Sequence, residues 1–267
     1  MKKIAGVLAL CFCIPFFCSA FSKVESTGKN ALILMSLSEE QQLGRESYAE
    51  ILKESKLSTN AEYNERLNRI ATRLIASVGK EAPAGTVWEY HVIEDETVNA
   101  FALPGGQFAV YSGLMKIAND DELAYVIGHE LGHVTARHGA QRMSQQAVIS
   151  MAGQLAQGMF DTSSKQQIFA IAYGLGSQVG ATLPFSRSNE YEADDLGSRY
   201  AAQAGYHPDG GLTMLEKLMK LSGSNGNGSD WLSTHPADTK RIAQLKNLYS
   251  RNNQFTKKQK NNFFNFA

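Results

Sequence analysis

The spacing of apolar residues predicts two helices near the start of the chain. Residues 39–57 place apolar side chains at helical intervals, and Ser38 followed by Gln41 has the spacing of a capping box. Residues 61–78 repeat this pattern behind Asn60, a residue that favours the N-cap position. The apolar positions of this second segment are Leu67, Ile70, Leu74, Ile75 and Val78. We therefore expect two amphipathic helices that each bury one face.

The pattern then changes from helical spacing to alternation, which indicates a small sheet. Residues 86–93 alternate as a strand does. Residues 97–111 hold two short strand-like stretches on either side of Pro104-Gly105-Gly106, a sequence typical of a hairpin turn. We expect these stretches to pair in one sheet.

Helical spacing returns after Asn119. Asn119 and Glu122 form an N-cap pair for a helix over about 120–138. The remaining predicted helical segments are 147–160, 166–183, 187–204, 208–221 and a last helix after Pro236, with a Gly- and Ser-rich loop over 222–230. The apolar segments 147–160 and 166–183 are interrupted by Gln154, Gln157 and Gln178, so we expect neither segment to span a membrane. The whole pattern predicts a helix-rich α+β fold with a small mixed sheet.

The first 20 residues have the layout of a secretory signal peptide. Two lysines precede an apolar run over 4–17, and Cys18-Ser19-Ala20 supplies small residues for cleavage after Ala20. Bulky residues precede each of the three cysteines, which disfavours a lipoprotein signal. All cysteines lie in this segment, so the exported chain would use no disulfide and no cysteine nucleophile. We expect a signal peptide over 1–20, a linker over 21–37, one domain over 38–250 and a polar tail over 251–267, in a periplasmic or secreted protein.

The charge composition excludes some classes of partner. The 267 residues include 26 Lys and Arg against 26 Asp and Glu, which is unlike a basic nucleic-acid-binding protein or an acidic disordered chain. Removal of residues 1–20 would leave 24 basic against 26 acidic residues. We expect no nucleic-acid partner.

One pentapeptide carries the chemistry of a metallopeptidase. His129 and His133 are four residues apart on the predicted helix, so both imidazoles can reach one Zn²⁺ ion. Glu130 lies beside them, where it can take a proton from water at the metal. His138 is five residues after His133, and we expect it to be a cationic or capping group at the end of the helix.

The third protein ligand is expected from a later helix. Ala136 and Gly139 exclude the motif in which a third histidine follows the pentapeptide. The acidic candidates further along the chain are Glu190, Glu192, Asp194 and Asp195. Glu190 and Asp194 share a helix face, so we favour Glu190 as the ligand and Asp194 as the acceptor of a ligand histidine's N–H, with the other candidates left open.

Several motifs in this order resemble one family. They are HELGH (129–133), SRSNEYEAD (186–194), THP (234–236), NAFALPGG (99–106), VYSGL (110–114) and AGYHP (204–208). In these motifs the chain is similar to the CAAX-prenyl-protease-like zinc metallopeptidases, metallopeptidase family forty-eight, and among them to the soluble periplasmic members of the LoiP and BepA type. The matching blocks cover about residues 40–250.

This resemblance implies a zincin-like (gluzincin) domain with zinc endopeptidase activity. It implies His129, His133 and Glu190 as zinc ligands, Glu130 as the general base and Asp194 as the partner of a ligand histidine. It also implies that an edge strand beside the zinc helix binds substrate, and we assign this strand to residues 107–111. The late His235 would either stabilise the oxyanion or occupy the open position on the zinc.

The resemblance also implies substrates and partners. These are unfolded or misassembled cell-envelope proteins, with possible association with the outer membrane or its assembly machinery. Two alternatives stay open: a chaperone-like binding module whose metal site is kept latent by residues 141–183 and His235, and a processing peptidase of narrow specificity.

Overall fold

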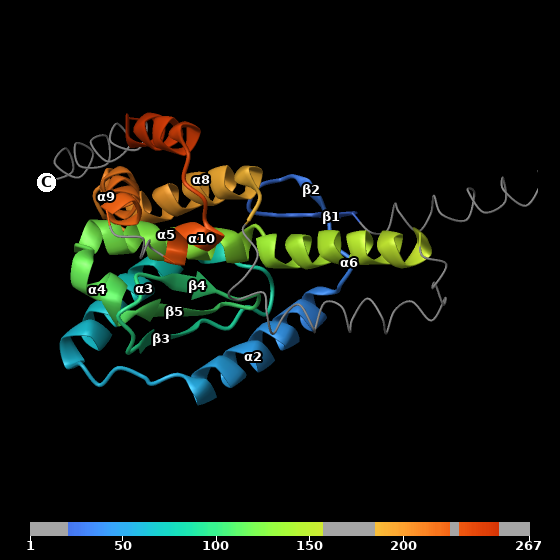
Figure 1. Ribbon diagram of the computed structural model, residues 1–267, viewed down its shortest axis with the longest axis horizontal. Helices are drawn as coiled ribbons and strands as arrows, with labels where there is room; N and C mark the ends of the chain where they lie inside the picture. Colours follow the sequence, from blue (N-terminus) through green and yellow to red (C-terminus); the bar gives the residue numbers. More distant parts are fainter. Residues whose placement is uncertain (1–20, 157–184, 225–229, 251–267) are drawn as a thin grey trace, which may run out of the picture.

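The computed structural model describes residues 21–156, 185–224 and 230–250. A three-stranded sheet lies between α2 (Leu37–Glu54) on one side and α3 (Ala61–Val78) with α5 (Asp120–Thr135) on the other (Figure 1). Helices α8 (Arg187–Gln203) and α9 (Gly210–Ser224) cover the far side of α5. The predicted signal peptide, the segment 166–183 and the tail 251–267 lie outside the described residues.

The first two helices form where predicted, with one change of cap. Helix α3 begins behind Asn60, whose side chain accepts a hydrogen bond from the Tyr63 amide. Helix α2 does not begin behind Ser38 as predicted. Its capping box joins Ser36 to Glu39, while Gln41 is buried and donates to the carbonyl of Ala84. The pairs Ser36/Glu39 and Ser38/Gln41 have the same spacing, and only the tertiary contact of Gln41 distinguishes them.

The sheet is mixed, as the sequence predicts. Its order is β3 (Glu89–Ile93), β5 (Gln107–Tyr111) and β4 (Ala100–Ala102). Strands β3 and β5 are parallel, and β4 and β5 are antiparallel with Phe101 opposite Ala109. Residues 107–111 are therefore the central strand, and the assignment of the substrate-binding edge to them is wrong.

The edge strand beside the zinc-type helix is instead β4. Strand β4 contacts α5 directly, and within the described residues no strand pairs with its other side. The hairpin itself was predicted, but its order in the sheet depends on the parallel pairing of β3 with β5. That pairing joins residues 18 positions apart, so no local pattern reports it.

Two glycines let α5 and α8 approach each other closely. A Cβ atom at Gly128 would lie 2.8 Å from the carbonyl oxygen of Gly197, and one at Gly197 would lie 2.5 Å from the amide nitrogen of His129. Both distances are too short for a side chain, so the crossing requires glycine on each helix. This contact brings the start of α8 against the second half of α5.

Helix α5 ends at Thr135, three residues earlier than predicted. Arg137 adopts a left-handed backbone conformation (φ 54°) directly after the C-cap residue Ala136, the position at which helices often use this conformation. Its guanidinium bonds both carboxylate oxygens of the buried Glu40. The chain can then start α6 (His138–Ala156) at once in a new direction.

Residues 21–37 form more structure than the linker that the sequence indicates. Strands β1 (Phe21–Lys23) and β2 (Asn30–Leu32) pair as an antiparallel hairpin, which lies beside α6 (Figure 1). Val24 and Ile33 are buried together with Ala140 of α6. These apolar residues give the hairpin its own small core, which explains the difference from the prediction.

The described residues also contain short helices and one late helical segment. Short helices are η1 (Gly79–Glu81), α4 (Ser112–Ile117) and α10 (Asp230–Thr234), and residues 239–250 are also helical. Helix α9 continues to Ser224 and α10 begins at Asp230, so both ends of the segment expected to be a loop over 222–230 are helical. Among the described residues, no helix combines the length and apolar character needed to cross a bilayer.

Candidate metal centre

Two helices and the segment after α10 bring four metal-ligating side chains together. His129 and His133 lie one turn apart on α5, Glu190 lies in the first turn of α8, and His235 directly follows α10. All four are buried, and their candidate ligand atoms lie within 4.8 Å of one another. The close crossing at Gly128 and Gly197 is what allows Glu190 to reach the two histidines.

The distances within this group suit one small cation. The Nε2 atoms of His129 and His133 are 3.0 Å apart, and the Glu190 carboxylate lies 3.5 and 3.4 Å from them. His235 Nδ1 lies 3.1 Å from Glu190 Oε1 and 3.2 Å from His129 Nε2. Ligand atoms that each lie about 2 Å from one zinc ion are separated by roughly 3.3 Å in a tetrahedron. The four side chains thus have the mutual spacing of a four-coordinate site.

A buried oxygen supports the same interpretation. Glu190 Oε2 is buried and accepts no hydrogen bond from the described residues. Arg241 Nη1 lies 2.7 Å from it and forms an ion pair without hydrogen-bond geometry. Buried carboxylate oxygens are normally satisfied, and this one points toward His129 Nε2. Two imidazoles and a carboxylate with a free lone pair fit a divalent cation such as zinc.

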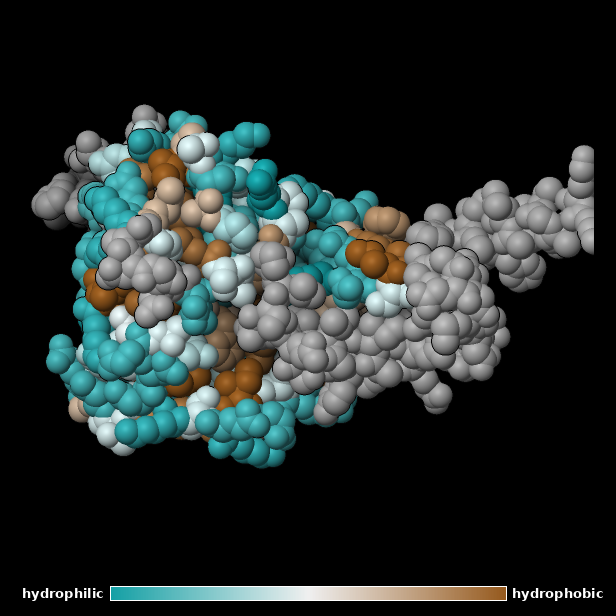
Figure 2. Space-filling model, in the orientation of Figure 1, coloured by the Kyte–Doolittle hydropathy of each residue, from teal (hydrophilic) through white to brown (hydrophobic). Residues whose placement is uncertain are grey.

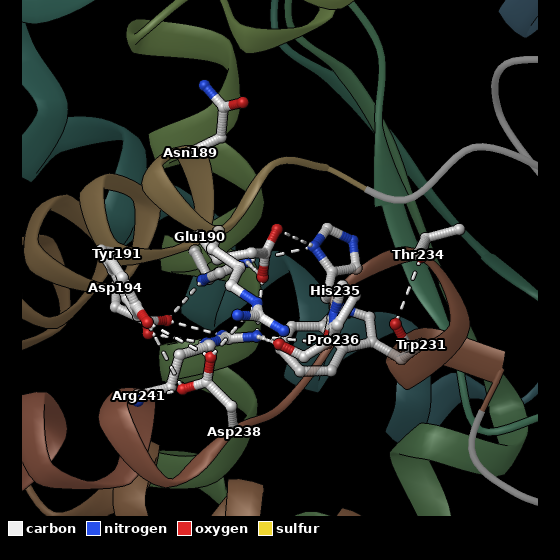
Figure 3. A network of polar contacts seen from close by, with 12 residues as sticks. Asn189, Glu190, Tyr191, Asp194, Trp231, Thr234, His235, Pro236, Asp238 and Arg241 are labelled. Carbon is white, nitrogen blue, oxygen red and sulfur yellow. Dashed lines mark hydrogen bonds and ion pairs between the residues drawn. The ribbon is translucent and has the colours of Figure 1, made fainter.

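His129 is held by a charged network in the core. Its Nδ1 lies 2.9 Å from Asp194 Oδ1, which also accepts a hydrogen bond of 2.7 Å from the Tyr125 hydroxyl. Arg241, which is 1% exposed, donates to both oxygens of Asp194 at 2.9 and 2.7 Å (Figure 3). The contact that the sequence suggested between Asp194 and a ligand histidine is therefore present in the structure.

The charges in this network shift the pKa values of its members. Burial alone would raise the pKa of Asp194, but Arg241 and the hydrogen bond from His129 lower it. Burial also opposes a raised pKa at His129, yet the hydrogen bonds to Asp194 and Glu190 raise it to about 9. The pKa of Glu190 is lowered as well. Burial would raise it, but His235 and His129 outweigh burial and hold it well below the usual range. Both carboxylates are therefore ionised and can bind or orient cations.

His133 is held by a different partner, His138. The prediction that His138 is a cationic group at the end of the helix is wrong, because the turn at Arg137 places it at the start of α6, fully buried. Its Nδ1 lies 2.9 Å from His133 Nδ1, and its Nε2 lies 3.0 Å from Glu192 Oε2. Burial lowers the pKa of His138 despite that carboxylate, so His138 is neutral.

Glu130 lies at the open side of the group and is bound to Trp231. Trp231 Nε1 donates to Glu130 Oε1 at 2.9 Å, and the Trp231 ring stacks on His235 at 4.6 Å between centroids. His235 Nε2 lies 3.4 Å from the same oxygen of Glu130. Figure 3 shows His235 and Trp231 side by side, with His235 directed toward Glu190. Helix α10 and the residue directly after it therefore supply two side chains, Trp231 and His235, that contact the centre.

Comparison with known proteins agrees with this geometry. The model of peptidase family M48 matches residues 61–249, which include His129, Glu130, His133 and Glu190 and extend past His235. The chain belongs to peptidase family M48. The resemblance predicted from the sequence motifs is thus confirmed.

Three relatives illustrate the range of the M48 proteins. The chain is 33% identical to mitochondrial metalloendopeptidase OMA1 of Schizosaccharomyces pombe over 223 residues, 79% of this chain and 61% of that protein. It is 34% identical to metalloprotease LoiP of Escherichia coli over 194 residues, 72% of each chain. It is 28% identical to the beta-barrel assembly-enhancing protease of Escherichia coli over 239 residues, 87% of this chain and 48% of that protein. The chain thus spans between about half and three quarters of these relatives.

A cleft leads from the surface of this M48 domain to Glu130 and His133. Its walls come from α2, the strand β4 with the turn after it, and the start of α6. Hydrophobic residues also gather on the surface between α2 and the sheet (Figure 2). The edge strand β4, whose other side pairs with no strand among the described residues, therefore lines the same cleft as Glu130 and His133.

Sequence reasoning assigned no role in this site to Tyr125, Trp231 or Arg241, and it assigned the wrong role to His138. Arg241 lies in the helix over 239–250, where a single arginine among polar residues resembles any solvated helix face. Trp231 was detectable in principle, because a tryptophan four positions before a His-Pro motif is unusual at the end of a segment rich in Gly and Ser. Glu192, considered as a ligand, instead pairs with His138.

Proposed function

We propose that this M48 chain is a zinc-dependent endopeptidase with His129, His133 and Glu190 as its metal ligands. The observation that carries the proposal is the buried group of these three side chains with Glu130 beside it at the end of a cleft. Zinc suits this ligand set of two imidazoles and one carboxylate. When bound, it would polarise the scissile carbonyl and lower the pKa of water.

The protein's own residues would divide the remaining work. Glu130 takes a proton from the attacking water and later delivers it to the leaving amine. Asp194 accepts the Nδ1 proton of His129, so that the Nε2 lone pair faces the metal. The free side of β4 would pair with an extended substrate and direct its backbone past Glu130.

We propose further that the described arrangement is a closed form of the enzyme. A catalytic zinc site keeps one position open for water or substrate. Here His235 Nδ1 occupies the fourth corner of the group, and Trp231 holds Glu130 through a hydrogen bond. Catalysis would then require α10 and His235 to move away, which favours the role of His235 as a switch over its role in oxyanion stabilisation.

For substrates and location, we propose unfolded or misassembled cell-envelope proteins in the periplasm. The signal peptide expected over 1–20 supports export. A substrate that pairs through its backbone with β4 must be extended, which favours unfolded clients. One relative is named for enhancing beta-barrel assembly, which motivates a test of outer-membrane clients and of the assembly machinery as a partner. A lipid anchor is less favoured because of the residues before each cysteine.

A second candidate function follows from the same closed form. If His235 and Trp231 never leave the centre, the chain would bind unfolded proteins in the cleft without cleaving them, as a chaperone-like module with a latent metal site. A processing peptidase of narrow specificity would differ only in the range of substrates.

Casein cleavage by the purified chain, with and without a chelator, separates these functions. We expect chelator-sensitive cleavage that Glu130→Gln abolishes and that the surface control Glu65→Gln leaves unchanged. His235→Ala should increase the rate if His235 closes the site. Binding of casein without cleavage in every variant, His235→Ala included, would favour the chaperone-like module. Substrates trapped in cells by Glu130→Gln would then identify the clients.

A further inference from the structure

A buried chain of polar groups leads from His133 to the surface of the molecule. It runs from His133 Nδ1 to His138 Nδ1 (2.9 Å), and from His138 Nε2 to Glu192 Oε2 (3.0 Å). Glu192 Oε1 then pairs with Lys29 Nζ at 2.6 Å. His138 is fully buried, so its two ring nitrogens have these two partners as their hydrogen-bond environment.

The order of donors along this chain follows from Glu192. A carboxylate accepts hydrogen bonds and cannot donate them, so the Nε2 of His138 must carry the proton that faces Glu192. A neutral imidazole has one donor and one acceptor nitrogen, which leaves the Nδ1 of His138 as an acceptor. His133 must then donate from its own Nδ1. The remaining nitrogen of His133, Nε2, keeps its lone pair toward Glu190 and His129.

Lys29 connects this chain to the N-terminal hairpin. It lies in the turn between β1 and β2, and its hairpin is attached to the end of α5 by a hydrogen bond from Ser26 Oγ to the Thr135 carbonyl. Its pairing orients the Glu192 carboxylate, of which one oxygen faces Lys29 and the other faces His138. The hairpin thus contacts the outermost member of a chain that ends at the proposed metal ligand.

We infer that His138 is the positioning residue of His133 and that Glu192 sets the tautomer of His138, so that together they present the His133 Nε2 lone pair to the metal. This inference rests on the proposed metal site. Through the contact of Lys29 with Glu192, the hairpin of residues 21–34 would be part of the support of the centre.

Metal affinity of the full chain tests the inference without reference to activity. We would measure Zn²⁺ dissociation constants by competition with a chromophoric chelator, and the absorption spectrum of the Co²⁺-substituted protein. His138→Phe keeps a ring but removes the acceptor, and we expect affinity to fall by about 10- to 100-fold, with an altered Co²⁺ spectrum. His138→Asn places an amide oxygen near the Nδ1 position, so its Zn²⁺ affinity should be close to that of the wild-type protein. The control is His207→Phe, since His207 is not part of the hydrogen-bonded series from His133 to Lys29. This variant should change neither the Zn²⁺ affinity nor the Co²⁺ spectrum.

A double-variant cycle tests the tautomer step. Glu192→Met should weaken Zn²⁺ binding by about threefold or more in the wild-type background, because either nitrogen of His138 can then carry the proton. It should have no effect in the His138→Asn background, where no tautomer remains to be selected. This comparison also holds if His138→Phe fails to fold.

The outcomes separate the inference from the proposed function. Wild-type affinity and spectrum in His138→Phe, or His138→Asn as weak as His138→Phe, would overturn the inference. So would a Glu192→Met effect of equal size in both backgrounds. Failure of the wild-type chain to bind Zn²⁺ at all would instead overturn the proposed metal site.

Discussion

The two histidines of α5 lie one turn apart, yet their surroundings are of different kinds. His129 is supported by Asp194, which is held by Arg241 and Tyr125, and none of these side chains is more than 2% exposed. His133 is supported by the neutral His138, followed by Glu192 and the 72% exposed Lys29. The first support is charged and enclosed in the core. The second begins in the core and ends at a surface hairpin.

This difference indicates how each support fails. A buried charge that loses its partner is costly, so the His129 side should respond to substitution in the stability of the whole domain. A neutral hydrogen bond that is lost costs less, so the His133 side should respond mainly in metal affinity. The following predictions order the two sides by the size of the expected effect.

Arg241→Met should cause the largest change. It leaves Asp194 and Glu190 as buried carboxylates without their cation, and we expect unfolding free energy to fall by about 3–5 kcal/mol. Denaturant unfolding measures this. The matched control is Arg199→Met. Arg199 donates two hydrogen bonds to Glu81 in a partly exposed ion pair, so its loss should lower the unfolding free energy by about 1 kcal/mol or less. Equal losses in both variants would show that the core network is no different from a surface pair.

Asp194→Asn should weaken metal binding by about 10- to 100-fold, because it removes the negative charge that attracts the Nδ1 proton of His129. The Zn²⁺ affinity of this variant should be compared with that of His138→Phe. Asp194 and His138 support different histidines, so the effects of the two substitutions on the Zn²⁺ dissociation constant should multiply in the double variant. Strong non-additivity would mean that the two supports act as one network.

Lys29→Ala should give the smallest change. Lys29 is mostly exposed, so solvent screens its ion pair with Glu192, and Zn²⁺ affinity should fall by about twofold or less at low salt. The effect should disappear at high salt, where surface pairs are screened. Lys23→Ala, on the same hairpin, serves as the control. A loss as large as that of His138→Phe would place the hairpin inside the centre rather than at its edge.

Local patterns were enough to predict much of the fold. The caps at Asn60 and Asn119, the helices behind them and the hairpin around Pro104 depend on neighbouring residues, and all are present in the structure. The HELGH spacing likewise places His129 and His133 on one face of α5, and the spacing of Glu190 and Asp194 places both on one face of α8. These features were predictable because a helix fixes the relative positions of residues four apart.

The parts that could not be predicted depend on long-range contacts. The central place of β5 follows from its parallel pairing with β3, and the burial of His138 follows from the turn at Arg137 that Glu40 stabilises. Arg241 reaches Asp194 across 47 positions of the sequence. No periodicity or motif in the chain reports such pairings, so the roles of Arg241 and His138 could be found only from the structure.

We propose that a metal held by His129, His133 and Glu190 works with Glu130 to cleave peptide bonds. Parallel measurement of zinc content and casein cleavage in His235→Ala and in His235→Ala/Glu130→Gln tests it most directly. The account predicts one zinc ion per chain in both variants, with cleavage at least about 100-fold slower in the second. A zinc-loaded double variant that cleaves casein as fast as His235→Ala alone would contradict it.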